Sequence, residues 1–424
     1  MENALVFLPG SNLNDLQNIE NCFTQPVYDM NSLNITFFAE QCSFFPTIQQ
    51  YYPAEALEFL KIIKYLSQLA LNTNNLLPPS LQKLKKMQNL DNIELSRRQV
   101  ALLFLLSFFD VLPISFSKDL NTFKISDVLR EGKGTTFEIA RCFLNYLTII
   151  GKWLFENNPI LDEKIIYVRE NINRNKFDFL SMNNYNLCPV NFIKQGSLFY
   201  GNTPYCVDFA NKYIGGSILK GGSVQEEILF AINPEATVAM LFMESMDEND
   251  GIGIFNTIQY SNYKGYGNSF EFNGTTIYDG FTNNIKRNRI IAIDAERNDK
   301  QLNNVDLNNY QRIINRDIYK AFAGFHLTTY DMGFEKSIST GNWGCGVYNG
   351  IFELKFLEQW IAASFSMVQR LDYYTFGKEE MQKVINCYEF IKNKFGTASN
   401  LYRALIYYKL DANDFINCLV NGQF

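Results

Sequence analysis

The sequence predicts an α/β protein with a mainly helical N-terminal part, and three observations support this fold class. The chain has 424 residues, of which 47% are hydrophobic, which is enough for two or three domains with substantial cores. Apolar residues recur at helical spacing through the first half, whereas short β-rich runs alternate with helical stretches in the second. The character changes near Asn157-Asn158-Pro159, so we expect a helical domain over residues 1–158 and an α/β domain over residues 159–424.

Four signals mark the expected helices of the first half. Pro53 stands at a plausible first helical position, and apolar residues follow it at helical spacing. Ser80 can cap a short helix. Ser96-Arg97-Arg98-Gln99 fits a capping box before the apolar run 100–109, which at about ten residues is too short for a membrane span and indicates a core helix. Thr135-Thr136-Phe137-Glu138 fits a second capping box.

The second half contains strand-like runs separated by helical stretches. The strand-like runs are residues 165–168, 205–209, 252–259, 290–293 and 373–376. The helical stretches are residues 233–246, 308–325, 352–365, 379–395 and 398–410. This alternation is typical of an α/β sandwich.

Charge and composition argue against several classes of function. The formal charge is −6 and the pI about 5.2, whereas a protein that grips nucleic acid non-specifically normally has a basic surplus. We therefore expect no direct nucleic-acid binding, and any anionic substrate must be held by local groups. The start, Met1-Glu2-Asn3-Ala4, lacks the basic region of a secretory signal, and no apolar run is long enough to span a bilayer, so no membrane association is expected.

The eight cysteines and the single histidine restrict metal and triad chemistry. The cysteines are scattered and form no Cys-x-x-Cys pair, which favours free thiols in a reducing compartment over a disulfide framework or a zinc site. We expect an intracellular protein, in the nucleus, the cytoplasm or both. His326 alone cannot build a multi-histidine metal site, and a structural position after a helix is its expected role.

The densest unusual stretch is the glycine-rich segment 215–223 followed by Gln225-Glu226-Glu227. Glycines near a strand end let the backbone approach a ligand closely, and a helix beginning near Val224 would direct N–H groups at an anion. A helix N-terminus also favours carboxylates, so a structural acidic pair is an alternative. Two nucleotide motifs fit poorly, because Gly222 stands where a P-loop needs lysine and Gly251-Ile252-Gly253 lacks the third glycine of a Rossmann fingerprint.

A second glycine cluster and a group of aromatic residues lie further along the chain. Residues 341–350 precede a predicted helix and could cradle a diphosphate with backbone N–H groups, although a plain turn fits equally well. Residues 260–267 place tyrosines beside glycines, and such rings can stack on a base, although most single tyrosines are packing residues.

Together these motifs resemble the poly(ADP-ribose) glycohydrolase family. Its signature is a glycine triplet, about six to eight residues, then Gln-Glu-Glu; here Gly215-Gly216-Ser217 precedes seven residues and Gln225-Glu226-Glu227, with Ser217 in place of the third glycine. Residues 95–99 resemble the helical accessory domain of the eukaryotic-type enzymes. Other matching segments follow in family order: Val207-Asp208-Phe209-Ala210-Asn211, residues 260–266, Ile293-Asp294-Ala295, residues 340–346 and Tyr374-Thr375-Phe376-Gly377.

The resemblance implies a macrodomain-like mixed sheet sandwiched by helices, with ADP-ribose in a cleft at its edge. Glu227 would be the general acid and then the base, Glu226 and Asn211 would hold ribose hydroxyls, and Tyr266 and Phe376 would flank the adenine. A neighbouring carboxylate and partial burial raise the pKa of a carboxyl group, which suits a proton donor. With Glu226 and Glu227 as catalytic residues, the expected substrate-binding residues are Asp208, Phe209, Asn211, Gly215, Gly216, Gln225, Tyr266, Asn342, Gly344, Cys345, Gly346, Tyr348 and Phe376.

The resemblance also implies the substrate and partners. We expect cleavage of the ribose–ribose bonds of poly(ADP-ribose), release of ADP-ribose, contact with poly(ADP-ribosyl)ated proteins and a place in the DNA damage response. No cofactor is expected, and no metal ion, because the carboxylate cluster of the metal-dependent ADP-ribosyl hydrolases is missing from the sequence. The alternative is a macrodomain reader that binds ADP-ribose without cleaving it, and the presence of Glu227 argues against it.

Overall fold

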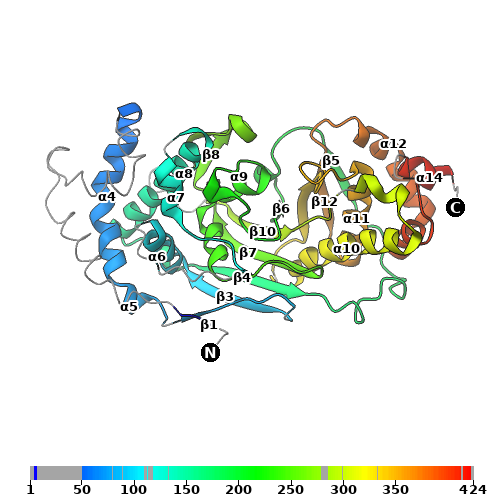
Figure 1. The fold of residues 1–424 in the computed structure, drawn as a ribbon, viewed down its shortest axis with the longest axis horizontal. Helices are drawn as coiled ribbons and strands as arrows, with labels where there is room; N and C mark the ends of the chain where they lie inside the picture. Colours follow the sequence, from blue (N-terminus) through cyan, green and yellow to red (C-terminus); the bar gives the residue numbers. More distant parts are fainter. Residues whose placement is uncertain are drawn as a thin grey trace.

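The computed structural model describes residues 4–6, 50–78, 80–87, 89–108, 112, 118–131, 133–277, 285–297, 299–331, 333–411 and 414–421. At its centre lies an eight-stranded mixed sheet (Figure 1). In spatial order its strands are β3 (Asp91–Ser96), β4 (Lys164–Asn171), β7 (Asp250–Ile258), β10 (Arg287–Ile293), β6 (Tyr205–Phe209), β11 (Ser337–Gly341), β12 (Arg370–Tyr374) and β5 (Val190–Ile193). Two small pairs accompany it, β1 (Ala4–Val6) with β2 (Ser80–Gln82) and β8 (Ser261–Lys264) with β9 (Glu271–Thr275).

The sheet has an antiparallel half and a parallel half. Strands β3, β4, β7 and β10 pair antiparallel, whereas β10, β6, β11, β12 and β5 pair parallel. Because the carboxyl ends of parallel strands meet at one edge, the segments that follow β6, β10, β11 and β12 lie along the same edge of the sheet. Ligands of open α/β sheets bind outside this edge.

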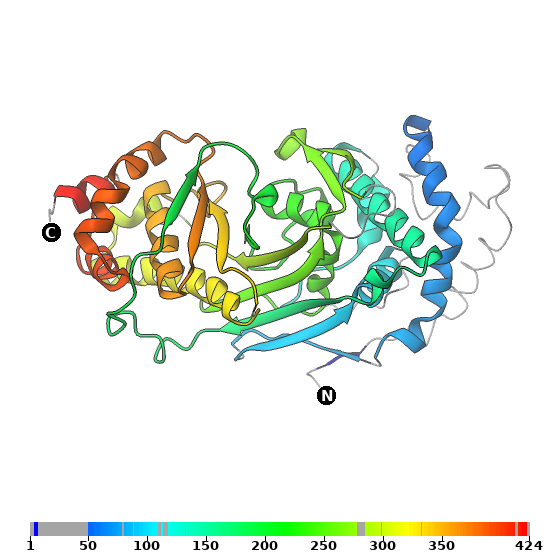
Figure 2. The ribbon, with the colours of Figure 1, turned by 180° about the vertical axis from the view of Figure 1, so that it is seen from behind.

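Helices cover both faces of the sheet. On one face α9 (Gln225–Ile232) shares a core with the N-terminal helices and with the strand residues Ile252 and Ile290. On the other face α10 (Leu307–His326), α11 (Phe352–Phe365) and α13 (Ala398–Tyr407) share a core with Val207 and Ile291. Figures 1 and 2 show the N-terminal helices at one end of the molecule and the last helices at the other. The remaining α-helices of the described residues are α4 (Pro53–Leu71), α5 (Thr73–Leu76), α6 (Arg97–Phe108), α7 (Ile125–Glu131), α8 (Gly134–Phe155), α12 (Glu380–Phe395) and α14 (Phe415–Asn421).

Several elements follow the sequence expectations closely. The run 205–209 is β6, the stretch 352–365 is α11, and Pro53 begins α4. The capping box of α6 is also confirmed, because the Ser96 amide donates to Gln99 Oε1 at 2.8 Å and the Gln99 amide donates to Ser96 Oγ at 3.2 Å. The apolar run that follows is buried, as expected of a core helix.

Three local expectations are wrong, each because a distant part of the chain decides the local structure. Ser80 begins β2 and pairs with the N-terminal strand β1, so it caps no helix. Thr135 lies inside α8, and its hydroxyl donates to the carbonyl of Gly221 at 2.8 Å instead of capping. Of the stretch 233–246, only residues 234–241 are helical, as the 3₁₀ helix η4 (Pro234–Leu241), which packs against α6.

The N-terminal part and the sheet are physically joined. Strand β3 precedes the expected domain boundary at 158/159 but forms the edge of the large sheet by pairing with β4. Arg97, at the start of α6, forms a buried ion pair with Glu235 of η4. The boundary therefore stays a prediction, and the helices reach the site through shared contacts.

The single histidine and two buried cysteines make contacts within the protein that fit a structural role. His326 is the last residue of α10, and its Nδ1 lies 2.9 Å from Glu170 Oε2. Cys142 and Cys188 are buried and form no disulfide, and burial raises the pKa of Cys188 to about 12, which makes its thiol unreactive. Within the described residues, no helix is both long and apolar enough to cross a membrane.

Candidate functional site

The structure brings most of the predicted site residues to the carboxyl edge of the parallel strands. Asp208 and Phe209 end β6, and Asn211 follows it. Gln225, Glu226 and Glu227 form the first turn of α9, the next α-helix along the chain. Asn342, Gly344, Cys345, Gly346 and Tyr348 follow β11, and Phe376 follows β12.

The Glu227 carboxylate is buried and held by the loop that precedes α9. Its Oε1 accepts hydrogen bonds from the amide and from the hydroxyl of Ser217, both at 3.0 Å. Its Oε2 accepts one from the amide of Val224 at 3.2 Å. A carboxylate offers about four acceptor positions, so Oε2 is the oxygen with more capacity left for a proton or a ligand.

Glu226 holds the other side of the same loop. Its Oε2 accepts from the Asn211 amide at 2.8 Å and its Oε1 from the Gly215 amide at 2.7 Å. Burial raises its pKa, and the nearby charges of Asp208 and Glu227 raise it further. Because both oxygens bind the backbone, the structural alternative accounts for the position of Glu226. Its contact with ribose hydroxyls stays a prediction.

Gln225 joins β6 to α9. Its Oε1 accepts from the Phe209 amide at 2.7 Å, and its Nε2 donates to the Val207 carbonyl at 2.9 Å. Asn211 Oδ1 accepts from the Tyr213 amide at 3.0 Å. These contacts fix the strand end and the helix start relative to each other, whereas substrate contacts of Gln225 and Asn211 remain predicted.

The two glycines of the signature are sterically required. Gly215 and Gly216 have φ of +83° and +51°, which favour glycine. A Cβ on Gly216 would also lie 2.6 Å from Oε atoms of both Glu226 and Glu227. Ser217, by contrast, has φ −107°, which any residue adopts, so serine fits the third position without strain.

Asp208 lies beneath the acidic pair. Its side chain is buried, and neither carboxyl oxygen has a hydrogen-bond partner among the described residues. Burial raises its pKa, and the charge of Glu227 raises it further. The pKa values of Asp208 and Glu226 are therefore both raised, in each case first by burial and then by the charges of nearby carboxylates.

The N-terminal part binds the glycine loop that precedes α9. Asn121 Nδ2 donates to the carbonyls of Ile214 at 3.0 Å and Gly216 at 2.9 Å, and Thr135 Oγ1 binds the Gly221 carbonyl. Sequence reasoning missed Asn121 and the contact of Thr135, because their partners lie 86 to 95 residues away and no local pattern marks the pairs.

The base of the second glycine loop is tied to the neighbouring strands. The Trp343 indole donates to the Ile293 carbonyl of β10 at 2.9 Å, and Asn342 Nδ2 donates to the Thr375 carbonyl after β12 at 3.1 Å. Gly344 has φ +73°, and a Cβ there would lie 2.7 Å from the Cβ of Ala295. Gly344 is therefore required by the protein itself.

The tip of the second loop is open. A Cβ built on Gly346 meets no heavy atom within 4 Å, and Val347 is 78% exposed. Cys345 and Tyr348 are half-buried on either side. Backbone N–H groups at such a tip can face an anion, as the sequence predicts.

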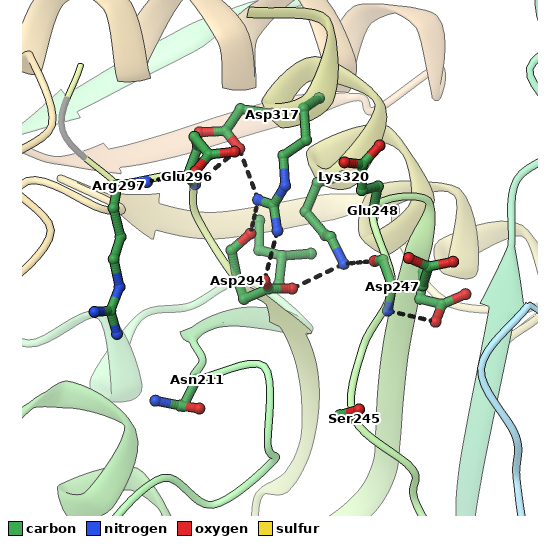
Figure 3. Close-up of polar contacts among 12 residues, drawn as sticks. Asn211, Ser245, Asp247, Glu248, Asp294, Glu296, Arg297, Asp317 and Lys320 are labelled. Carbon is green, nitrogen blue, oxygen red and sulfur yellow. Dashed lines mark hydrogen bonds and ion pairs between the residues drawn. The ribbon is translucent and has the colours of Figure 1, made fainter. Parts of the chain in front are cut away.

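A buried ion network lies beneath this loop (Figure 3). Asp294, directly after β10, accepts from Arg316 Nη2 at 2.5 Å and lies 2.8 Å from Lys320 Nζ. Burial alone would raise the pKa of Asp294, but Lys320 and Arg316 outweigh it and hold the pKa below its usual range. Asp317 continues the network by binding Arg316 at 2.7 Å and Lys355.

One exposed cation lies beside the second loop. The Arg297 guanidinium stands 4.5 Å from the ring centroid of Tyr348, a cation–π geometry. Figure 3 shows its side chain extending away from the buried ions. Sequence reasoning missed Arg297, although it follows the Ile293-Asp294-Ala295 motif by only one residue.

The two predicted adenine-flanking rings are exposed at the site. Tyr266 is 60% and Phe376 45% exposed. The amide of the next residue, Gly267, donates to the Ser223 carbonyl at 2.8 Å, which places Tyr266 beside the first glycine loop. Desolvation raises the pKa of the Tyr266 hydroxyl, and the charge of Glu227 raises it further. Phe376 has φ +51°, and its ring packs near that of Tyr374, with centroids 6.2 Å apart. Their contact with adenine stays a prediction.

Across the part of the chain that the structure describes, no three His, Cys, Asp or Glu side chains are grouped to hold a metal ion. This finding concerns geometry alone, so metal independence stays a prediction.

Comparison with known proteins defines the class. A macrodomain-fold profile of poly(ADP-ribose) glycohydrolase matches residues 177–383, and the helical-domain profile of the same enzyme matches residues 52–169. The expected fold class, a macrodomain-like sheet with an N-terminal helical part, is thereby confirmed. The chain belongs to the poly(ADP-ribose) glycohydrolase family.

Individual relatives agree with this assignment. The chain is 30% identical over 313 residues to the probable poly(ADP-ribose) glycohydrolase 2 of Arabidopsis thaliana, covering 63% of this chain and 58% of that protein. It is 32% identical over 269 residues to poly(ADP-ribose) glycohydrolase 1 of the same plant, covering 48% of each. The chain thus spans about half the length of these relatives. A crystal structure of poly(ADP-ribose) glycohydrolase from Thermomonospora curvata is 13% identical with a TM-score of 0.32, over 50% of this chain and 80% of that one.

Proposed function

We propose that this chain hydrolyses the ribose–ribose O-glycosidic bonds of poly(ADP-ribose) and releases ADP-ribose, with Glu227 as general acid and then base. Membership of the family supports the reaction class. The observation that carries the residue assignment is the Glu227 carboxyl group itself. It is buried at the carboxyl edge of the parallel strands, with one oxygen bound by two donors and the other by one.

The chemistry follows from this arrangement. Glu227 donates its proton to the leaving ribose O2′ while the C1″–O2′ bond breaks and its electron pair passes to O2′. The resulting Glu227 carboxylate then takes a proton from water, which attacks the oxocarbenium-like C1″. The ligand's own diphosphate, held by the second glycine loop, helps to offset the positive charge. Arg297, stacked on Tyr348, adds a cation near that diphosphate.

The wider role belongs to the same proposal. The substrates are poly(ADP-ribose) chains on modified proteins, in the nucleus or the cytoplasm, where such chains mark DNA damage. The second candidate is a reader that binds ADP-ribose without cleaving it. The observation in favour of a reader is that Glu226 and Glu227 both bind the protein's own loop, which is a structural role that needs no catalysis.

The test is release of ADP-ribose from labelled polymer, with and without EDTA. The proposal expects release at the same rate in both conditions. Polymer that stays bound and intact identifies a reader, and release that EDTA abolishes shows that a metal ion is needed.

A further inference from the structure

Ser217 occupies the third position of the glycine signature. The first two positions need glycine, because both have positive φ angles and because a Cβ would meet Met240 at Gly215 and the acidic pair at Gly216. The third position has a backbone conformation that any residue adopts, so it can carry a side chain, and the contacts of that side chain can matter.

The side chain of Ser217 contacts Glu227. Its hydroxyl and its amide both donate to Oε1 at 3.0 Å, and two donors on one carboxylate oxygen stabilise negative charge there. A glycine at this position would supply the amide alone. Serine therefore adds one hydrogen bond to the carboxyl group proposed to transfer the proton.

The loop leaves room for this hydroxyl at one specific place. A Cβ on Gly222 would lie 2.1 Å from Ser217 Oγ, and the Gly222 amide donates to the Ser217 carbonyl at 3.0 Å. The Ser217 hydroxyl thus occupies the space that a side chain at residue 222 would need. The turn closed by the Gly222–Ser217 hydrogen bond limits the other rotamers of Ser217.

We propose that Ser217 is a positioning residue for Glu227. It fixes Oε1 as the charged oxygen, so that the transferable proton resides on Oε2, and it favours the ionised form of the carboxyl group. This inference rests on the proposed function. It predicts that, as pH rises, the activity of the unchanged chain falls off at a lower pH than the activity of a Ser217→Gly variant.

The experiment compares the pH dependence of kcat/KM for polymer hydrolysis in Ser217→Gly, Ser217→Ala and the unchanged chain. Both variants keep the amide donor and lose the hydroxyl. The basic limb should move to higher pH by about half to one unit, because one hydrogen bond to the charged form is removed. Affinity for ADP-ribose should stay within about twofold, because the lost hydrogen bond joins Ser217 to Glu227 within the protein and does not involve the ligand.

The matched control is Ser223→Ala, which removes another serine hydroxyl of the same loop. Ser223 Oγ donates to the Gly267 carbonyl at 2.9 Å, so this variant should leave the basic limb unmoved. An unmoved limb in both Ser217 variants overturns the role of Ser217 while polymer hydrolysis persists. Absence of hydrolysis in the unchanged chain overturns the proposed function instead, so the two failures are distinct.

A double substitution tests the fit between the two residues. Gly222→Ala should reduce turnover much more in the unchanged chain than in the Ser217→Gly variant, because the closest clash is with Ser217 Oγ. Equal losses in both backgrounds contradict the packing of the hydroxyl against Gly222.

Discussion

The two glycine loops of the site differ in how firmly the protein holds them. The first, residues 214–223, is held by Glu226 and Glu227 of α9 and by Asn121 and Thr135 of the N-terminal part. The second, residues 341–350, is anchored at its base, and its tip at Gly346 is open.

The difference separates two tasks. A proton-transfer group must be held within a fraction of an ångström, and surrounding hydrogen bonds provide that precision. A loop that wraps a diphosphate needs unfilled space and N–H groups that a ligand can reach. We therefore expect changes in the first loop to reduce turnover more than binding, and changes at the tip of the second loop to reduce binding.

The largest expected effect tests the first half of this comparison. Glu227→Gln should keep ADP-ribose affinity and lower kcat by roughly 10²–10⁴-fold, because the amide cannot donate and retrieve a proton. Its carbonyl can still accept from Ser217, so the loop should keep its shape. Single-turnover hydrolysis and calorimetry measure the two quantities.

A glutamate in the first turn of another helix serves as the control for this change. Glu353 lies in the first turn of α11, near Lys383 and Glu380 of α12, so Glu353→Gln should keep full turnover. Normal hydrolysis by Glu227→Gln would remove Glu227 from the mechanism.

The second prediction concerns the open tip of the second loop. Gly346→Val should weaken ADP-ribose binding by up to roughly 100-fold without changing the melting temperature, because the new side chain meets no protein atom but fills the space meant for phosphate oxygens. Gly344→Ala is the contrasting variant. It should lower the melting temperature, because of its φ of +73° and its contact with Ala295. Full affinity in Gly346→Val would place the diphosphate elsewhere.

How much the sequence predicts also differs between the loops. The sequence predicted a strand over residues 205–209 before the first loop and a helix after the second, and the structure gathers Glu227, Asn211 and the second loop at one edge because parallel strands share a direction. Sequence reasoning treated Ser217 only as a lost glycine, because a hydrogen bond to a residue ten positions away leaves no pattern. The sequence also placed Gly344 among the substrate-binding residues, whereas contact with the protein's own Ala295 accounts for the glycine there.

The third prediction concerns the exposed ring that borders the first loop. Tyr266→Ala should weaken ADP-ribose binding by about one to two decades, since stacking on a base is worth about 1–3 kcal/mol. Tyr266→Phe keeps the ring and removes the hydroxyl near Glu227, so it should retain affinity. Calorimetry separates the two. Unchanged affinity in Tyr266→Ala would show that adenine lies elsewhere, and equal losses in both variants would assign the contact to the hydroxyl.

The smallest expected effect concerns stability, and it uses the carboxyl groups beneath the two loops. Asp208, under the first loop, has a raised pKa because it is buried beside Glu227. A raised folded-state pKa imposes no cost below the unfolded value of about 3.9, and its cost grows as pH rises toward the folded value. Asp208→Asn removes this cost, so it should raise Tm by a few degrees at pH 7.5 and the gain should vanish near pH 4.

Asp294, under the second loop, should behave in the opposite way. Its pKa is lowered because Lys320 and Arg316 outweigh the effect of burial, so its charged form stabilises the fold above the unfolded pKa, and that contribution is lost as pH falls. Asp294→Asn should therefore lower Tm at pH 7.5, and the deficit should narrow toward acid. Thermal unfolding of both variants between pH 4 and 8 measures the pair. A lower Tm for Asp208→Asn at pH 7.5 would mean that the Asp208 charge is compensated, and the first loop would then rest on a paired carboxylate, as the second does.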